Sequence, residues 1–286
     1  MKNNFIKAYE NEIAILGILH RFGHARHVDI ARAVWPGSST RSADNTARRT
    51  LHRLMERRLI GRVLNPYLGY SYTLRRAGAN RVASEIDGSK PSHNKTVSIS
   101  SSRFYHHTLG TRYMIEKEIT GLTVYGEHAI YRGVEGFSRE LFSKQFKKIP
   151  DGIALAPGAT RGLDPEITAM DWIEVENYYK PPDELRRIIE LSGKIGTWID
   201  SDRQIMLDRI VFVYSVMSDH ERSLLNGIGS YIREQNITDP HTLSSIVVAQ
   251  CDVMPPLRWL GYTELSCLRL REFGLVKIPG KLPVSA

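Results

Sequence analysis

The sequence predicts an α/β (α+β) protein built of two domains. The amino-terminal part reads as three helices followed by two short strands, and the rest of the chain alternates helices with strands. The chain has 286 residues, enough for two domains of ordinary size, and its 42% hydrophobic and 24% charged residues are typical of globular proteins. We therefore expect domains at residues 1–86 and 102–286, joined by a polar, Gly/Pro/Ser-rich linker at 87–101.

The first domain shows apolar residues at helical spacing and then a hairpin pattern. The expected elements are helices at 12–21, 28–34 and 42–58 and strands at 60–64 and 70–74. Trp35-Pro36-Gly37 ends the second helix, and the turn at 65–69 joins the two strands. Three helices followed by a hairpin predict a winged helix-turn-helix.

Positive charge is concentrated in this domain. Residues 1–90 contain 16 Lys and Arg against 7 Asp and Glu, a net charge of +9, whereas the whole chain carries +8. A basic module joined to a near-neutral remainder is typical of a protein that binds a polyanion, here double-stranded DNA.

The third helix of a winged helix enters the major groove, and its flanks follow the phosphates. We expect base or phosphate contacts from the polar side chains of this helix, and backbone contacts from the wing. The predicted DNA-binding residues are Arg41, Asn45, Arg48, Arg49, Arg53 and, on the wing, Arg62. The alternative is a solvated helix face that serves a protein partner, since winged helices also dimerise; a homodimer is therefore left open.

The second domain predicts a mixed sheet flanked by helices. We expect helices at 103–119, 183–199 and 220–235 and strands at 122–128, 148–156, 170–177, 209–216 and 245–250. The continuous apolar run at 209–216 is typical of a strand that is buried on both faces.

Two predicted strands carry acidic residues. Asp151 follows a proline at the start of one strand, and Glu174 and Glu176 are two apart on the next, so their side chains leave the same face. Carboxylate oxygens are the ligands that Mg²⁺ and Mn²⁺ prefer, so these three residues predict a divalent-metal site. The alternative is three solvated carboxylates on the surface of a sheet.

The Pro-Asp pair with Asp151, the Glu174-x-Glu176 pattern and Lys194 on the following helix resemble the PD-(D/E)xK nuclease core. Glu176 stands where that core usually has lysine. Lys194 sits where a lysine that has migrated to the adjacent helix would lie, and Lys180 is a weaker candidate.

Together with the winged helix and the histidine-bearing helix (His106-His107), these motifs resemble the replication-relaxation proteins, in particular the MobC-type relaxases of mobilisable plasmids. The resemblance implies a restriction-endonuclease-like second domain that nicks one strand at a plasmid transfer origin. Implied partners are accessory relaxosome proteins and a coupling protein. The implied catalytic residues are Asp151, Glu174, Glu176, Lys194 and His107, with the three carboxylates holding Mg²⁺ or Mn²⁺.

Three alternatives stay open. Tyr178, Tyr179, Tyr105 or Tyr113 could form a covalent DNA intermediate, although metal-activated hydrolysis is favoured. The nuclease-like domain could be inactive, which leaves a DNA-binding initiator or accessory factor. The chain could also be a transcriptional regulator whose second domain senses a ligand or dimerises.

Composition excludes several other classes. No uninterrupted apolar run approaches the roughly 18 residues of a membrane span, and residues 1–7 lack the apolar core of a signal peptide. Cys251 and Cys267 are too few for a disulfide framework or a thiolate zinc site. We expect a soluble, cytoplasmic protein.

Overall fold

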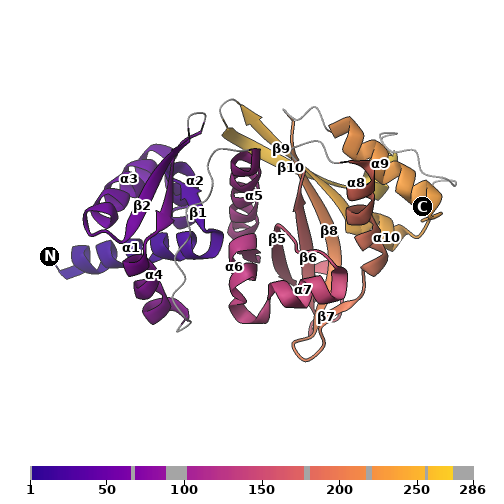
Figure 1. Ribbon diagram of the computed structural model, residues 1–286, viewed down its shortest axis with the longest axis horizontal. Helices are drawn as coiled ribbons and strands as arrows, with labels where there is room; N and C mark the ends of the chain where they lie inside the picture. Colours follow the sequence, from indigo (N-terminus) through magenta and orange to yellow (C-terminus); the bar gives the residue numbers. More distant parts are fainter. Residues whose placement is uncertain are drawn as a thin grey trace. The chain divides into compact units, whose positions relative to one another are not determined.

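The computed structural model describes residues 2–65, 68–87, 102–176, 181–216, 221–254 and 257–272. It confirms the mixed α/β class (Figure 1). By its internal contacts the chain forms two compact units, residues 1–152 and 153–286. The linker predicted at 87–101 lies outside the described residues, apart from Asp87.

The first unit opens with helices around a small sheet. Its first elements are α1 (Lys2–Phe22), β1 (His24–Arg26), α2 (His27–Val34), α3 (Thr40–Glu56), β2 (Ile60–Asn65) and β3 (Gly69–Leu74). The three strands are antiparallel in the order β1-β3-β2. The predicted helices and hairpin are therefore present. The sequence misses β1, because three residues are too few to show a strand period.

Apolar stripes hold these helices together. Leu16 and Leu19 of α1 and Ala47, Leu51 and Leu54 of α3 are all fully buried. They recur at three- and four-residue intervals, so each helix turns one apolar face inward and leaves the opposite face to water. In α3 the buried residues lie on one face, and the opposite, exposed face carries arginines.

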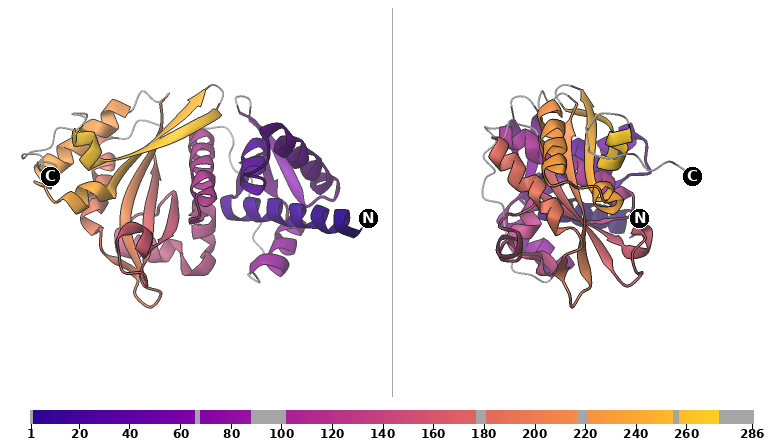
Figure 2. Two further views of the ribbon diagram at one scale, coloured as in Figure 1. Left: turned by 180° about the vertical axis from the view of Figure 1, so that it is seen from behind. Right: turned by 90° about the vertical axis from the view of Figure 1, so that its right-hand side faces the viewer.

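Helix α1 is longer than the sequence predicts: it begins at Lys2 rather than at residue 12. Its amino-terminal end projects past α3 and α4 (Figures 1 and 2). Phe5 and Ile6 accordingly remain 77% and 56% exposed. The prediction is too short because this end of the helix buries no apolar stripe.

The remainder of the first unit consists of α4 (Arg76–Val82), η1 (Ala83–Asp87), α5 (Ser102–Ile119), β4 (Thr123–Gly126), α6 (Glu127–Arg132), η2 (Val134–Gly136) and α7 (Arg139–Phe146). Ion pairs tie α5 to α2: Arg32 Nη2 lies 2.8 Å from Glu116, and Arg112 Nη1 lies 3.5 Å from Asp29. Burial alone would raise the pKa of Asp29, but the adjacent Arg26 and Arg112 outweigh it and the pKa is lowered. Ion pairs thus connect α2 with α5.

The second unit is built on a mixed sheet. Its elements are β5 (Gly152–Pro157), η3 (Gly158–Arg161), β6 (Thr168–Val175), α8 (Pro182–Ile189), η4 (Glu190–Lys194), β7 (Trp198–Asp200), β8 (Ile205–Ser215), α9 (Glu221–Glu234), α10 (Pro240–Ser245), β9 (Ile246–Met254), β10 (Arg258–Ser266) and α11 (Cys267–Glu272). The strands follow the order β10-β9-β8-β6-β5, with β7 pairing β8. Strands β6, β8 and β9 are parallel, whereas β7 and β10 are antiparallel to their neighbours. Helices α8, α9 and α10 lie along one side of this sheet (Figures 1 and 2).

The predicted elements of this unit are present, but one helix is shorter than predicted, and β7, α10, β10 and α11 are not predicted. The run at 209–216 is strand β8, and its apolar residues Ile210 and Val213 are fully buried, as expected. The helix predicted at 183–199 is shorter: α8 ends at Ile189, η4 follows, and Gly196 at φ +84° turns the chain into β7. Strand β10 is not predicted, because its side chains are only partly buried and show no clean alternation.

None of the helices in the described parts of the chain combines the length and the apolar character needed to cross a membrane.

Candidate functional site

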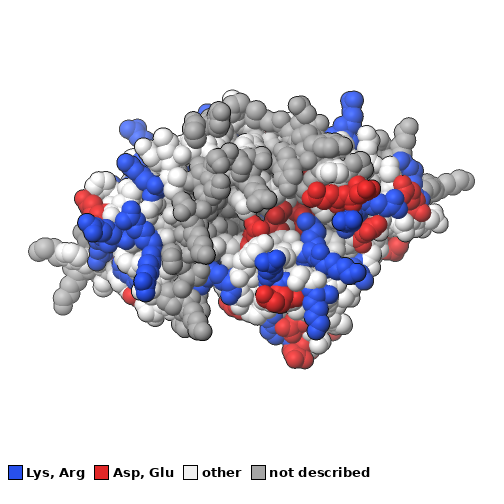
Figure 3. Space-filling view, in the orientation of Figure 1, with Lys and Arg blue, Asp and Glu red and all other residues white. Residues whose placement is uncertain are grey.

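The outward face of α3 is basic. Arg41, Asn45, Arg48 and Arg49 are all exposed, on the side of the helix opposite Ala47 and its buried neighbours. The Ser39 side chain caps the helix by accepting the backbone N–H of Ser42 at 3.4 Å. Lys and Arg side chains gather over this end of the unit in the space-filling view (Figure 3). Four of the six predicted DNA-binding residues therefore share one accessible face.

Arg48 is held in place by its neighbours. Its Nε donates to Asp44 Oδ2 at 2.9 Å, and its Nη2 lies 2.5 Å from His27 Nε2. Burial and the nearby Arg48 charge lower the pKa of His27, so the imidazole is neutral near pH 7 and can accept the Arg48 hydrogen bond. Arg48 is thereby presented in a defined orientation at the surface.

Arg53 has a different role from the other arginines of α3. Its Nε lies 3.7 Å from Glu12 of α1, which also contacts Arg57 at 2.7 Å and Arg81 at 3.1 Å. The Glu12 side chain is 7% exposed. Three guanidinium groups therefore surround one nearly buried carboxylate. Arg53 thus helps to join α1 to α3, a role that the sequence pattern does not reveal.

Arg62 lies on the hairpin, as predicted. It is exposed on β2, and its guanidinium stacks over the ring of Tyr70 on β3, 4.5 Å from the centroid. This cation–π contact orients Arg62 without neutralising it. Residues 66–67 of the predicted wing loop lie outside the described residues.

The histidines of α5 face two carboxylates of the same unit. His106 Nε2 lies 3.1 Å from Asp151 Oδ1, and His107 Nδ1 lies 3.4 Å from Glu127 Oε2. The Glu127 backbone N–H also donates to the Asp151 carbonyl oxygen at 2.9 Å. His107 was the predicted catalytic histidine, whereas the histidine that contacts Asp151 is His106. Glu127 was missed, because no pattern connects it to either histidine.

Glu174 lies near the carboxyl end of β6, and Glu176 follows the last residue of that strand, in the second unit. They are 1% and 4% exposed, which contradicts the alternative of solvated surface carboxylates for this pair. Trp172 Nε1 donates to Glu174 Oε1 at 2.6 Å, and the Glu176 N–H donates to the Val213 carbonyl at 2.7 Å. Asp171 is paired with Arg161 at 2.8 Å.

Lys194 is not brought to these glutamates. It is exposed on η4, two residues before Gly196, whose N–H donates to the Leu207 carbonyl. Glu174 is level with Phe212 in the parallel pairing of β6 and β8. Phe212 is five residue steps along β8 from Leu207, which corresponds to about 17 Å, so Lys194 and Glu174 lie near different ends of the strands. Lys180, together with Tyr178 and Tyr179, lies outside the described residues.

Asp151, Glu174 and Glu176 are the side chains that a bound metal ion would need. Carboxylate oxygens suit Mg²⁺ or Mn²⁺. Within the described ranges, however, no group of three or more His, Cys, Asp or Glu side chains is placed to hold an ion. Asp151, the third predicted ligand, belongs to the first unit and its carboxylate contacts His106. The three-carboxylate metal site therefore stays a prediction.

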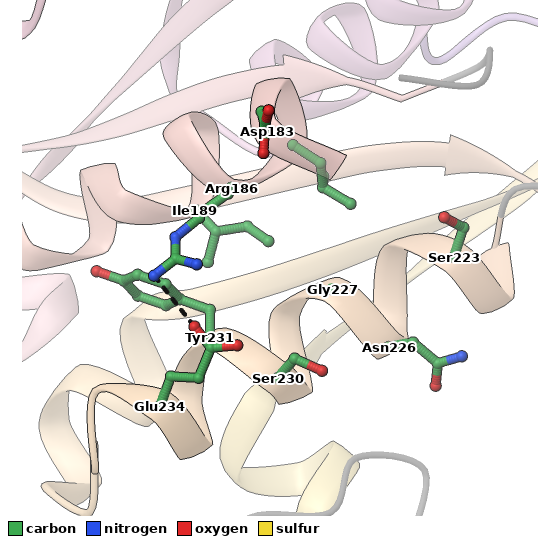
Figure 4. A pocket seen from close by; sticks show the side chains of 10 residues that line it. Asp183, Arg186, Ile189, Ser223, Asn226, Gly227, Ser230, Tyr231 and Glu234 are labelled. Atoms are coloured by element: carbon green, nitrogen blue, oxygen red, sulfur yellow. Dashed lines mark ion pairs between the residues drawn. The ribbon is translucent and has the colours of Figure 1, made fainter. Parts of the chain in front are cut away.

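A hollow of about 320 Å³ lies between α8 and α9. Figure 4 shows Arg186 reaching from α8 towards Glu234 of α9, and their charged groups are 3.1 Å apart. Leu185 and Ile189 supply apolar lining, and Tyr231 lies beside the ion pair. This hollow is where a ligand would be sought if the second unit were a sensor.

No family model, curated protein or solved structure matches the chain.

Proposed function

We propose that this chain is a DNA-binding protein whose first unit contains a winged helix, with α3 as the recognition helix. The element order α1-β1-α2-α3-β2-β3 and the strand order β1-β3-β2 support this. The observation that carries the proposal is the exposed face of α3, on which Arg41, Asn45, Arg48 and Arg49 lie opposite the buried face of the helix.

The chemistry of this face suits a duplex. Arginine guanidinium groups bind phosphate and the guanine edge in two-point contacts, and asparagine can do the same with adenine. Asn45 lies one helical turn from Arg41 and from Arg48 or Arg49, so all could face one groove. Arg62, stacked on Tyr70, would contact the backbone beside that groove.

The test is binding of the full-length protein to labelled duplexes, first a random-sequence pool and then the sequences it enriches. Arg41→Gln and Arg48→Gln should each weaken binding to the enriched duplex by about tenfold, as expected for loss of one base or phosphate contact. Arg222→Gln, which changes an exposed arginine of α9, is the matched control. Equal affinity of all four proteins would exclude α3 as the contact surface.

A second candidate activity is supported by the buried pair Glu174 and Glu176. We propose that the protein nicks one strand of DNA at a plasmid transfer origin, with these carboxylates assisted by Mg²⁺ or Mn²⁺. Two carboxylates two residues apart and almost without exposure support a chemical role, because carboxylate oxygens are the ligands that Mg²⁺ and Mn²⁺ prefer. Lys194 is not part of this proposal, because it lies at the other end of the strands.

The assay is conversion of supercoiled plasmid to open circles in the presence of EDTA, Mg²⁺ or Mn²⁺. Glu174→Gln keeps an oxygen that can accept the Trp172 hydrogen bond and removes the charge, so the fold should survive while nicking is lost. Asp151→Asn tests the predicted third ligand. A plasmid that stays supercoiled under every condition, although the protein binds it, would leave a DNA-binding initiator or accessory factor.

A further inference from the structure

A hollow in the first unit lies between α1 and α3. It has a volume of about 320 Å³ and an open rim. Its lining comes from Lys7, Ala8 and Asn11 of α1 and from Thr46, Arg49, Thr50 and Arg53 of α3. These side chains supply three cations, an amide and two hydroxyls, and none of the lining residues is acidic. The hollow therefore suits an anion.

The carboxylate that contacts Arg53 does not cancel this charge. Glu12 follows Asn11 on α1 and is already surrounded by Arg53, Arg57 and Arg81, at 3.7, 2.7 and 3.1 Å. Three guanidinium groups around one carboxylate leave an excess of positive charge beside the hollow. Glu12 thus holds Arg53, while Lys7 and Arg49, both exposed, are the other two cations of the lining.

The hollow borders the basic face of α3. Successive residues of an α-helix are about 100° apart around the axis, so Arg49 lies between Arg48, on the outward face, and Arg53, at the wall. A duplex that lies on the outward face would pass one of its backbones along this flank. A backbone phosphate is the anion that this position would meet.

We propose that the hollow between α1 and α3 binds a phosphate of the DNA backbone, with Lys7 and Arg49 as charged contacts and the Asn11 amide as a hydrogen-bond donor. The inference rests on the proposed DNA-binding function and extends the contact surface from α3 onto α1. It assigns Lys7 a role for which the sequence pattern offers no signal.

The proposal is tested by measuring the affinity of the full-length protein for an enriched duplex over a range of salt concentrations. Each phosphate contact contributes roughly one unit to the slope of log affinity against log salt. Lys7→Gln should weaken binding by about threefold to tenfold at about 0.1 M salt and lower the slope by about one. Lys144→Gln, which changes an exposed lysine of α7, is the matched control and should leave both unchanged.

A further arm distinguishes DNA phosphate from free phosphate. Inorganic phosphate is titrated into the native protein and into Lys7→Gln, at constant ionic strength, with amide chemical shifts of α1 as the readout. Saturable shifts at Asn11 in the native protein, combined with unchanged DNA affinity of Lys7→Gln, would make the hollow a free-anion site and overturn the proposal.

The measurements separate a failure of the phosphate site from a failure of DNA binding. If Lys7→Gln binds DNA like the native protein, with the same salt slope, while Arg48→Gln binds weakly, the hollow is not a contact but the DNA-binding function stands. If the native protein binds no duplex at any salt concentration, the proposed function fails and the hollow loses its DNA ligand with it.

Discussion

The Nε2 atom of His27 lies 2.5 Å from the guanidinium of Arg48 and 3.1 Å from Asp44 Oδ1. Only one of these contacts can be a hydrogen bond at a time. Neutral His27 accepts from Arg48, whereas protonated His27 would donate to Asp44. The protonation state of a half-buried imidazole therefore decides how a predicted DNA-contacting arginine is held.

This relationship predicts that DNA affinity depends on pH. Burial and Arg48 lower the pKa of His27, so half-protonation falls below the ordinary value of 6.5. Protonation adds a charge to the basic face and releases Arg48 from the imidazole. The other charges beside His27, Arg26 and Asp29, are paired with each other at 2.7 Å. We expect affinity to rise on the order of fivefold between about pH 7.5 and pH 5.5.

Fluorescence anisotropy of a labelled duplex at fixed ionic strength measures this. His27→Gln can still accept from Arg48 but does not titrate, so its affinity should change much less over the same interval. Identical pH profiles for the two proteins would exclude His27 as the responsive group.

Substitution of Glu12 should destabilise the first unit. Glu12→Ala removes the carboxylate on which Arg53, Arg57 and Arg81 converge and leaves three guanidinium groups to repel one another. Removing one member of a nearly buried ion pair typically lowers the free energy of unfolding by about 3 kcal/mol. Urea denaturation monitored by circular dichroism gives the value. Glu56→Ala, at an exposed position of α3, serves as the control and should change it by less than about 0.5 kcal/mol.

Acid should destabilise the fold through two buried histidines. Burial lowers the pKa of His24 to about 3 and that of His128 to about 4, against an ordinary 6.5. Below about pH 6.5 these two histidines are therefore protonated in the unfolded chain but remain neutral in the folded chain. The stability contribution is complete above pH 6.5 and is lost as the pH falls towards 4 and 3, by about 1.4 kcal/mol per pH unit for each histidine.

Urea denaturation at about pH 7 and about pH 5 should show this loss. The double variant His24→Gln/His128→Gln should lose clearly less stability over the same interval, whatever its stability at neutral pH. A double variant with the slope of the native protein would show that other groups cause the acid sensitivity.

The indole of Trp172 should be needed to keep Glu174 buried. Trp172→Phe preserves an aromatic side chain at a fully buried position but removes the N–H that donates to Glu174 Oε1 at 2.6 Å. Loss of a hydrogen bond to a buried charge should lower the free energy of unfolding by about 2 kcal/mol. Combining it with Glu174→Gln should recover part of the loss, because an amide is less costly to bury than a carboxylate. If the two effects simply added, the interaction between these residues would be excluded as the cause.

Much of the architecture can be predicted from local pattern. Ala47, Leu51 and Leu54 recur at helical spacing and mark the buried face of α3, and the unbroken apolar run of β8 marks a strand buried on both faces. Short elements such as β1 and β7, each of three residues, show no such period. They form because a neighbouring strand offers them hydrogen-bond partners.

The candidate site, too, has features that local sequence predicts and features that depend on tertiary contacts. By itself the sequence determined that α3 carries one apolar and one basic face, and that Glu174 and Glu176 occupy the end of one strand. Those features depend only on residues close together in the chain. Only the tertiary structure decided that Arg53 contacts Glu12, that His106 rather than His107 contacts Asp151, and that Lys194 lies far from the glutamates. Arg53 and Arg48 are the same residue type on the same helix. Their roles differ because Glu12 of α1 lies beside Arg53 and not beside Arg48. Residues 12 and 53 are far apart in the sequence, so no periodic pattern predicts their contact.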